Sequence, residues 1–208
     1  AQRQLNAADL PAPETRLALL GLTIEKLIAA GYVYIGMDHF ALPQDELVIA
    51  QENGTLHRNF QGYSTRGYCD LVGLGVSSIG KVGDNYMQNL KTLPEYYGAL
   101  DRGELAVHRG LSLTRDDVIR RDVIQQIMCY GMLDYDKTSE RFGIDFRSYF
   151  ASELLALEPM VADGLAELTD PGLRVLPAGR LLLRHLGMAF DAYLASAQAA
   201  QQRFSKAI

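Results

Sequence analysis

The sequence predicts an α/β region followed by a mainly helical region within one chain of 208 residues. Apolar positions in residues 15–28 recur at helical spacing, Gly31 follows them, and residues 32–37 have the β-branched and aromatic character of a buried strand. Further along the chain, such strand patterns give way to helical periodicity. We therefore divide the chain into two units, residues 1–90 and residues 91–208.

The first helix and strand form one step of an α/β pattern. Thr15 is a candidate N-cap for this helix, and Gly31 can end it. We expect the buried strand to be parallel to its neighbours. A polar turn containing Asp38 and His39 follows the strand. The C-terminal end of a parallel strand is where α/β enzymes place groups that bind ligands.

The next segments carry fewer regular signals. Residues 44–54 predict a short amphipathic helix, residues 55–68 a loop rich in polar and aromatic side chains, and residues 70–76 a short strand. Residues 75–82 nearly match a phosphate-binding P-loop, but Val82 stands where a Ser or Thr would hold magnesium. We therefore do not expect a P-loop. The alternative that this glycine-rich segment brings its backbone close to a ligand stays open.

The second unit reads as helices with one hairpin. Thr114 is a candidate N-cap, and the acidic residues after it suit the first turn of a helix. Helices are predicted over residues 93–100, 114–130, 146–157, 159–163 and 179–195, and a hairpin over residues 165–176. Helices, a small hairpin and a closing helix resemble a winged-helix arrangement.

The bulk composition limits the possible partners. Apolar residues make up 48% and charged residues 22% of the chain, which is the balance of a globular protein. The formal net charge of -5 argues against nucleic acid, and no apolar run reaches the roughly 20 residues that span a bilayer. We expect neither a nucleic acid nor a membrane partner.

The two cysteines, Cys69 and Cys129, lie 60 positions apart and make neither a disulfide framework nor a metal motif. They predict reduced thiols in a cytoplasmic protein, and we expect no metal site. The chain starts with Ala rather than Met, which suggests a fragment.

Two histidines lie in polar segments beside charged residues. His39 follows Asp38, and His57 precedes Arg58. Such pairs can bind an acidic substrate or move protons, and the guanidinium of Arg58 can bind a carboxylate with two parallel hydrogen bonds. The alternative is that both histidines are surface residues with local hydrogen bonds.

Several stretches together resemble one known family, and they lie at residues 34–41, 56–63, 73–79, 113–124 and 202–205. With these stretches the chain is similar, over nearly its whole length, to the bacterial oxygen-independent coproporphyrinogen III oxidases, a family of radical S-adenosylmethionine enzymes. The resemblance implies the C-terminal portion of such an enzyme. The last units of a partial TIM-like barrel would occupy the first unit, and a helical, winged-helix-like domain would follow.

The resemblance also implies a reaction. The family oxidatively decarboxylates two propionates of coproporphyrinogen III to give protoporphyrinogen IX in heme biosynthesis. It uses S-adenosylmethionine and a [4Fe–4S] cluster held by a Cys-x-x-x-Cys-x-x-Cys motif. This sequence has two cysteines and no such motif, so it cannot hold a cluster with three cysteines. We therefore expect these 208 residues to be inactive alone and to carry no cofactor of their own.

The resemblance assigns candidate site residues. Ile79 matches a position that packs on bound S-adenosylmethionine, and Phe60 and Gln61 match positions at the cavity for cofactor and substrate. To these we add four residues whose chemistry suits a substrate with four carboxylates, namely Asp38, His39, His57 and Arg58.

Two other functions stay open at this stage. Relatives in the same superfamily include heme chaperones without oxidase activity. A winged-helix module that binds DNA is a further alternative, but residues 91–208 hold 14 basic and 16 acidic side chains, which argues against it. We also expect self-association of the fragment through the open surface of the barrel.

Overall fold

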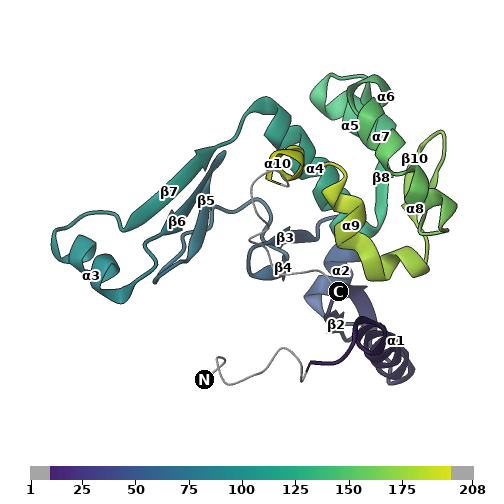
Figure 1. Cartoon of the computed structure of the whole chain (residues 1–208), viewed down its shortest axis with the longest axis horizontal. Helices are drawn as coiled ribbons and strands as arrows, with labels where there is room; N and C mark the ends of the chain where they lie inside the picture. The colour runs from purple at the N-terminus through teal and green to yellow at the C-terminus, as the bar shows by residue number, and fades with distance from the viewer. Residues whose placement is uncertain (1–9, 198–208) are drawn as a thin grey trace.

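The computed structural model describes residues 10–197, which form two helices with two small hairpins, a projecting arm and a helical region (Figure 1). The first part contains one longer helix and two small hairpins on either side of a second helix. Its elements are α1 (Pro13–Ala29), β1 (Val33–Gly36), β2 (His39–Ala41), α2 (Glu46–Glu52), β3 (His57–Asn59) and β4 (Gly62–Ser64).

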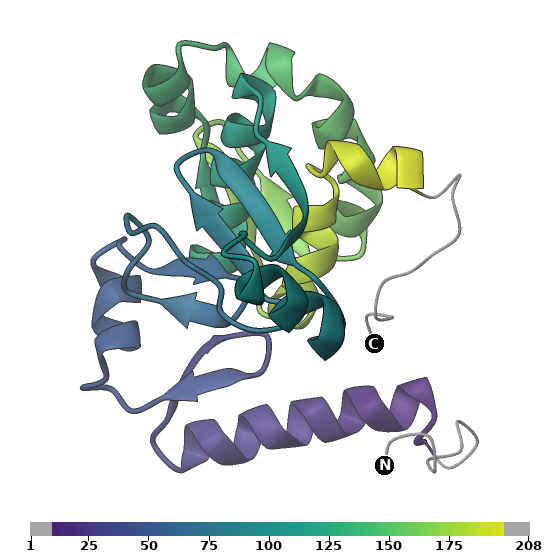
Figure 2. The ribbon, with the colours of Figure 1, turned by 90° about the vertical axis from the view of Figure 1, so that its left-hand side faces the viewer.

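Helix α1 confirms the predicted first helix, but its start differs from the prediction. The helix begins at Pro13, the N-cap Ala12 offers no side-chain hydrogen bond, and Thr15 lies inside the first turn. The predicted Thr15 cap is therefore wrong, because proline suits the first helical position without a cap. Gly31 follows the helix with a φ of 88°, as a helix-ending glycine does. None of the residues of α1 is buried, and the helix lies along one side of the molecule (Figure 2).

Strand β1 is buried as predicted, with Ile35 only 1% exposed, but its direction relative to its neighbour was predicted wrongly. It pairs antiparallel with β2 through a two-residue connection, Met37 and Asp38. A parallel pair would need a crossover of about a dozen residues, which the chain does not provide here. Every strand pair in residues 10–197 is antiparallel, so the predicted barrel units are not seen there.

Two predictions for the middle of the chain need correction. The expected loop over residues 55–68 contains the β3–β4 hairpin, which turns at Phe60 and Gln61. The strand expected over residues 70–76 is reduced to a single bridge at Leu71, and the strand itself, β5, spans Ile79–Val82. The P-loop-like glycine-rich stretch therefore leads into a strand rather than a helix N-terminus, which rules out P-loop geometry.

Strand β5 belongs to an arm that projects from the molecule (Figure 1). The sheet order is β5-β6-β7, with β6 at Asn85–Asn89 and β7 at Val107–Ser112. Helix α3 (Leu93–Asp101) connects β6 to β7 and lies at the far end of the arm. Strand β7 was not predicted, and it pairs with β6 across position 90. The boundary between the two predicted units stays a prediction.

The helical region confirms most of the predicted elements. It contains α4 (Arg115–Tyr130), β8 (Met132–Asp134), α5 (Tyr135–Phe142), α6 (Phe146–Tyr149), α7 (Ala151–Ala156), α8 (Glu158–Ala162), β9 (Ala166–Leu168), β10 (Gly172–Val175), η3 (Ala178–Leu182), α9 (Leu183–Met188) and α10 (Ala192–Ala197). Thr114 caps α4 in a capping box with Asp117, as its sequence position predicts. The predicted hairpin is β9–β10, and β8 adds a third strand in the order β8-β10-β9. The closing helix predicted as one element is three short ones.

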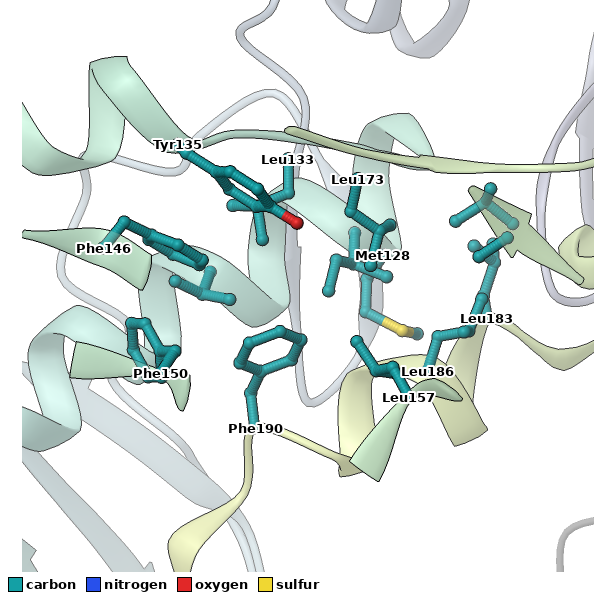
Figure 3. Close-up of a cluster of buried hydrophobic side chains, with 14 of the residues drawn as sticks. Met128, Leu133, Tyr135, Phe146, Phe150, Leu157, Leu173, Leu183, Leu186 and Phe190 are labelled. Carbon is teal, nitrogen blue, oxygen red and sulfur yellow. The ribbon is translucent and has the colours of Figure 1, made fainter. Parts of the chain in front are cut away.

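The core lies between α4 and the helices that follow it (Figure 3). The ring of Tyr135 stacks on Phe146 at 4.5 Å, and Phe150 meets Phe190 edge to face at 5.4 Å. A second, smaller cluster lies between α4 and the two hairpins, and its most buried members are Ile35 of β1 and Cys129 of α4. Helix α4 thus supports the hairpins on one side and the helical core on the other.

Candidate functional site

The two hairpins are fixed to helix α4 by side-chain hydrogen bonds. Gln51 Nε2, on α2, donates to the carbonyl of Ile35 at 2.9 Å and to that of Cys129 at 2.7 Å. The hydroxyl of Tyr63, on β4, donates to the carbonyl of Met128 at 2.9 Å. The bonds to Cys129 and Met128 satisfy carbonyls at the end of α4 that have no partner within the helix. The hairpins therefore have a defined position relative to the helical region.

Gln125 connects α4 directly to strand β3. Its Oε1 accepts from the backbone N–H of Arg58 at 2.9 Å, and its Nε2 donates to the carbonyl of the same residue. The thiol of Cys129, one turn later, donates to Gln125 Oε1 at 3.4 Å. The side chain of Gln125 thus binds both the N–H and the carbonyl of Arg58 and so fixes strand β3 to α4.

A first group of candidate residues meets around the phenol ring of Tyr63. His39 lies edge-on to this ring with 5.0 Å between centroids, and its Nδ1 is 2.8 Å from Asp38 Oδ1. The guanidinium carbon of Arg58 lies 5.8 Å from the ring centroid. Arg58 Nε is buried and has no hydrogen-bond partner among the described residues. The structure therefore brings Asp38, His39 and Arg58 together, and sequence reasoning did not find Tyr63 between them.

Burial raises the pKa values of two acidic side chains near Arg58, those of Tyr63 and Cys129. Desolvation raises the pKa of the Tyr63 phenol far above its ordinary value, with the neighbouring Cys129 adding to the effect. Desolvation also raises the pKa of the Cys129 thiol to about 12, although the nearby charge of Arg58 lowers it. Both groups are therefore protonated near neutral pH, and Arg58 faces them as a cation in a partly dry environment.

His57 lies on the other face of strand β3 from Arg58, because successive strand residues point to opposite faces. It lines a groove together with Lys81 and Arg121. The pKa of His57 is lowered, first by desolvation and then by these two cations. The structure therefore separates His57 from the group around Tyr63, although its sequence neighbour is in that group.

The candidate cofactor residues lie near one face of the arm. The ring of Phe60 meets Tyr86 edge to face at 5.4 Å. Tyr86 is opposite Lys81 and Gln88 is opposite Ile79 in the β5–β6 register, so Ile79 and Tyr86 share one face of the sheet. Phe60 is 57% exposed, and Gln61 beside it at the hairpin turn is exposed. The Phe60 ring thus contacts the sheet face of the arm that also carries Ile79.

The residues present do not fit an iron–sulfur cluster. The chain has two cysteines, of which Cys69 is exposed and Cys129 is buried and protonated. Within residues 10–197, no three His, Cys, Asp or Glu side chains are grouped so that they could hold one metal ion. The exposed ring of Phe60 and the exposed amide of Gln61 are side chains of the kind that can stack on a nucleoside base and form hydrogen bonds to it. No helix in the same range has the length and apolar character to cross a membrane.

Comparison with known proteins supports the resemblance. The family model described as the HemN C-terminal domain matches residues 113–182. An oxygen-independent coproporphyrinogen III oxidase of Pseudomonas aeruginosa is 54% identical over 207 residues, covering 100% of this chain and 45% of the relative. The enzyme of the same name from Escherichia coli is 49% identical over 208 residues, again covering 45% of the relative. This chain thus spans less than half the length of these relatives.

A solved structure is also similar to this chain, and it comes from a protein of the same name. The chain matches a structure titled as coproporphyrinogen III oxidase (HemN) from Escherichia coli, a radical SAM enzyme, with a TM-score of 0.87 and 49% identity. The match covers 92% of this chain and 44% of that chain. The resemblance expected from the sequence stretches is confirmed, and the stretch at residues 202–205 lies outside the described residues.

Proposed function

Because this chain is a relative of the oxygen-independent coproporphyrinogen III oxidases along its whole length, we propose that it supplies part of the active site of such an enzyme. The reaction would be oxidative decarboxylation of two propionates of coproporphyrinogen III in heme biosynthesis. The observation that carries the proposal is the contact of the Phe60 ring with Tyr86, on the sheet face that also carries Ile79, since the hairpin and the arm are far apart along the chain.

S-adenosylmethionine and a [4Fe–4S] cluster would supply the radical chemistry, and the cysteines for that cluster are not in this sequence. The residues of this chain would bind and orient. Phe60 and Ile79 offer apolar surface to the adenine of S-adenosylmethionine, and Gln61 offers a donor and an acceptor. The uncompensated Nε of Arg58 favours a role in binding a propionate carboxylate, with His39 and Asp38 beside it.

The same proposal includes finer structural assignments. The order α4, β8, α5, further helices, β9 and β10, with the sheet order β8-β10-β9, supports a winged-helix-like arrangement for the helical region. We keep the division into residues 1–90, as the part that would adjoin the barrel domain of the whole enzyme, and residues 91–208, as the helical domain. A cytoplasmic location belongs to the proposal as well. No observation favours the DNA-binding or heme-chaperone alternatives, and the reported relatives are named as oxidases.

The test is a chimera in which this chain replaces the corresponding segment of the Pseudomonas aeruginosa relative. Its product is measured anaerobically with coproporphyrinogen III and S-adenosylmethionine, and the 208-residue chain alone is the comparison. We expect protoporphyrinogen IX from the chimera and none from the chain alone. A chimera that folds and carries its cluster but forms no product would overturn the proposal, and stoichiometric heme binding in its place would support the chaperone alternative.

A further inference from the structure

A groove lies between the β3–β4 hairpin, strand β5 and helices α4 and α5. It encloses about 600 Å³, which is in the range of small-molecule sites. His57 lines it from β3, Lys81 from β5 and Arg121 from α4, and the polar residues Gln125 and Thr138 also contribute. These elements come from both halves of the chain, so the groove exists only in the folded protein.

The charged side chains that line the groove are mostly cationic. The lining contains four cationic side chains and one carboxylate. The cations are Lys81, Arg121, Lys137 and Arg141, and the carboxylate is Asp122. The whole chain carries a formal charge of -5, so this local excess is opposite in sign to the protein as a whole. A concave surface with one sign of charge concentrates ions of the other sign.

Some of these cations already have partners. Arg141 pairs with Asp122, and Lys137 lies 3.0 Å from the carboxylate of Asp134. The Lys137 pair is a surface pair of small energetic weight, because Lys137 is 83% exposed, whereas Arg141, itself 68% exposed, pairs with an Asp122 carboxylate that is only 16% exposed. Both pairs reduce the number of charges that are available to a ligand.

Lys81 and Arg121 have donors that the protein does not satisfy. No ion pair is formed by Lys81 within residues 10–197, and Arg121 Nη1 is buried without a hydrogen-bond partner there. Arg121 uses its other terminal nitrogen, Nη2, to reach Asp84 at 3.2 Å, and Asp84 is 63% exposed. Buried polar atoms normally have partners, so Arg121 Nη1 and the Lys81 ammonium, whose side chains line the same groove, are available to an acceptor on a ligand.

We propose that this groove binds an oxyanion, a carboxylate or phosphate group of a small ligand, and that Lys81 and Arg121 are its main contacts. Arginine and lysine are the side chains that form charge-assisted hydrogen bonds to such groups. His57 lies beside both and supplies a further donor when it is protonated. The inference does not depend on the proposed oxidase activity, because it concerns binding by residues of this chain alone.

The experiment measures anion binding by the 208-residue chain. Citrate serves as a polycarboxylate probe and inorganic pyrophosphate as a phosphate probe, each at low ionic strength. The NMR signals of the His57 ring report occupancy of the groove, and calorimetry gives the dissociation constant. Saturation by citrate alone would identify a carboxylate ligand, by pyrophosphate alone a phosphate ligand, and by both a site that selects on charge.

Two variants locate the site, and one serves as a control. Lys81→Ala and Arg121→Gln should each raise the dissociation constant of the probe about tenfold or more, which is the usual effect of losing one charge-assisted hydrogen bond. Lys91→Ala removes the same charge from an exposed position away from the groove and should leave binding unchanged. Circular dichroism confirms folding, and Lys81→Ala carries the test if Arg121→Gln unfolds. Absence of saturable binding by either probe, or equal loss in all three variants, would overturn the proposal.

Discussion

Removing the side chain of Gln125 should release strand β3 from helix α4. The Gln125 amide makes two hydrogen bonds to the backbone of Arg58 and accepts a third from the thiol of Cys129. A two-stranded hairpin such as β3–β4 is marginal by itself, so this contact with α4 stabilises it substantially. The variant Gln125→Ala leaves the N–H and carbonyl of Arg58 in a partly buried place without these partners.

The magnitude follows from the bonds lost. Each buried hydrogen bond contributes about 0.5–1.5 kcal/mol, and an unsatisfied buried group costs about 1–3 kcal/mol. Water can reach part of this half-buried strand, so we expect a total loss of about 2–3 kcal/mol. For a chain of this length that corresponds to a decrease in the melting temperature of about 4–12 °C.

The assay combines urea unfolding with hydrogen exchange. Urea unfolding followed by circular dichroism gives the change in the free energy of unfolding. Exchange of the Arg58 amide shows whether the loss is local to β3. The matched control is Gln44→Ala, an exposed glutamine before α2, which should change stability by less than about 0.5 kcal/mol. A Gln125→Ala variant as stable as this control, with the Arg58 amide still protected, would refute the reasoning.

Three further predictions concern other parts of the chain. In the chimera, Arg58→Ala should weaken substrate binding by about tenfold to a hundredfold, the effect of losing a bidentate bond of about 1.5–3 kcal/mol; an unchanged Michaelis constant would leave Arg58 with a structural role. Iodoacetamide at pH 8 should label the exposed Cys69 well before the buried Cys129, whose pKa is raised to about 12 by desolvation, and mass spectrometry of peptides checks the order. Helix α1 has exposed apolar side chains such as Leu22, which is 49% exposed, so the chain should self-associate and Leu22→Lys should reduce this; identical sedimentation of variant and parent would contradict that expectation.

The elements with a regular sequence pattern or a clear local signal were predictable from the sequence. Helices α1 and α4 have apolar positions at helical spacing, and the Thr114 cap of α4 has a local signature that does not depend on tertiary structure. The hairpin β9–β10 was predictable because a Pro-Gly turn separates two short apolar runs. In each case the decisive information lies within a few residues of the element.

The small strands were not predictable in the same way. Strands β2, β3 and β4 have three residues each, which is too short for an alternating pattern to be recognised. The direction of β1 relative to its neighbour could be predicted only if β2 was recognised. Because this three-residue strand was missed, we expected β1 to pair with a parallel strand rather than with β2 in an antiparallel hairpin. Arg120 shows the same limit, because its i,i+4 spacing to Asp116 is visible in the sequence but the burial of its side chain is not. The side chain is only 16% exposed and also binds Glu153, 33 positions away.

The candidate site shows which information came from chemistry and which from resemblance. Charge and polarity indicated His57 and Arg58, but only the structure shows that they face opposite sides of β3. The roles of Phe60 and Ile79 rest on resemblance to the family alone, because an exposed phenylalanine and a strand isoleucine have no distinguishing pattern, and they stay predictions. Gln125 was missed because its partners are backbone atoms 67 positions away.

The central claim is that the β3–β4 turn forms part of the site for cofactor and substrate, and Gln61 at that turn tests it most directly. The measurement is the anaerobic turnover number of the chimera carrying Gln61→Ala, compared with the chimera carrying Gln44→Ala. Loss of one hydrogen bond at the reacting centre, about 1–1.5 kcal/mol, should lower turnover about tenfold while cluster content and melting temperature stay the same. Equal turnover by the two chimeras would contradict the claim and place Gln61 outside the site.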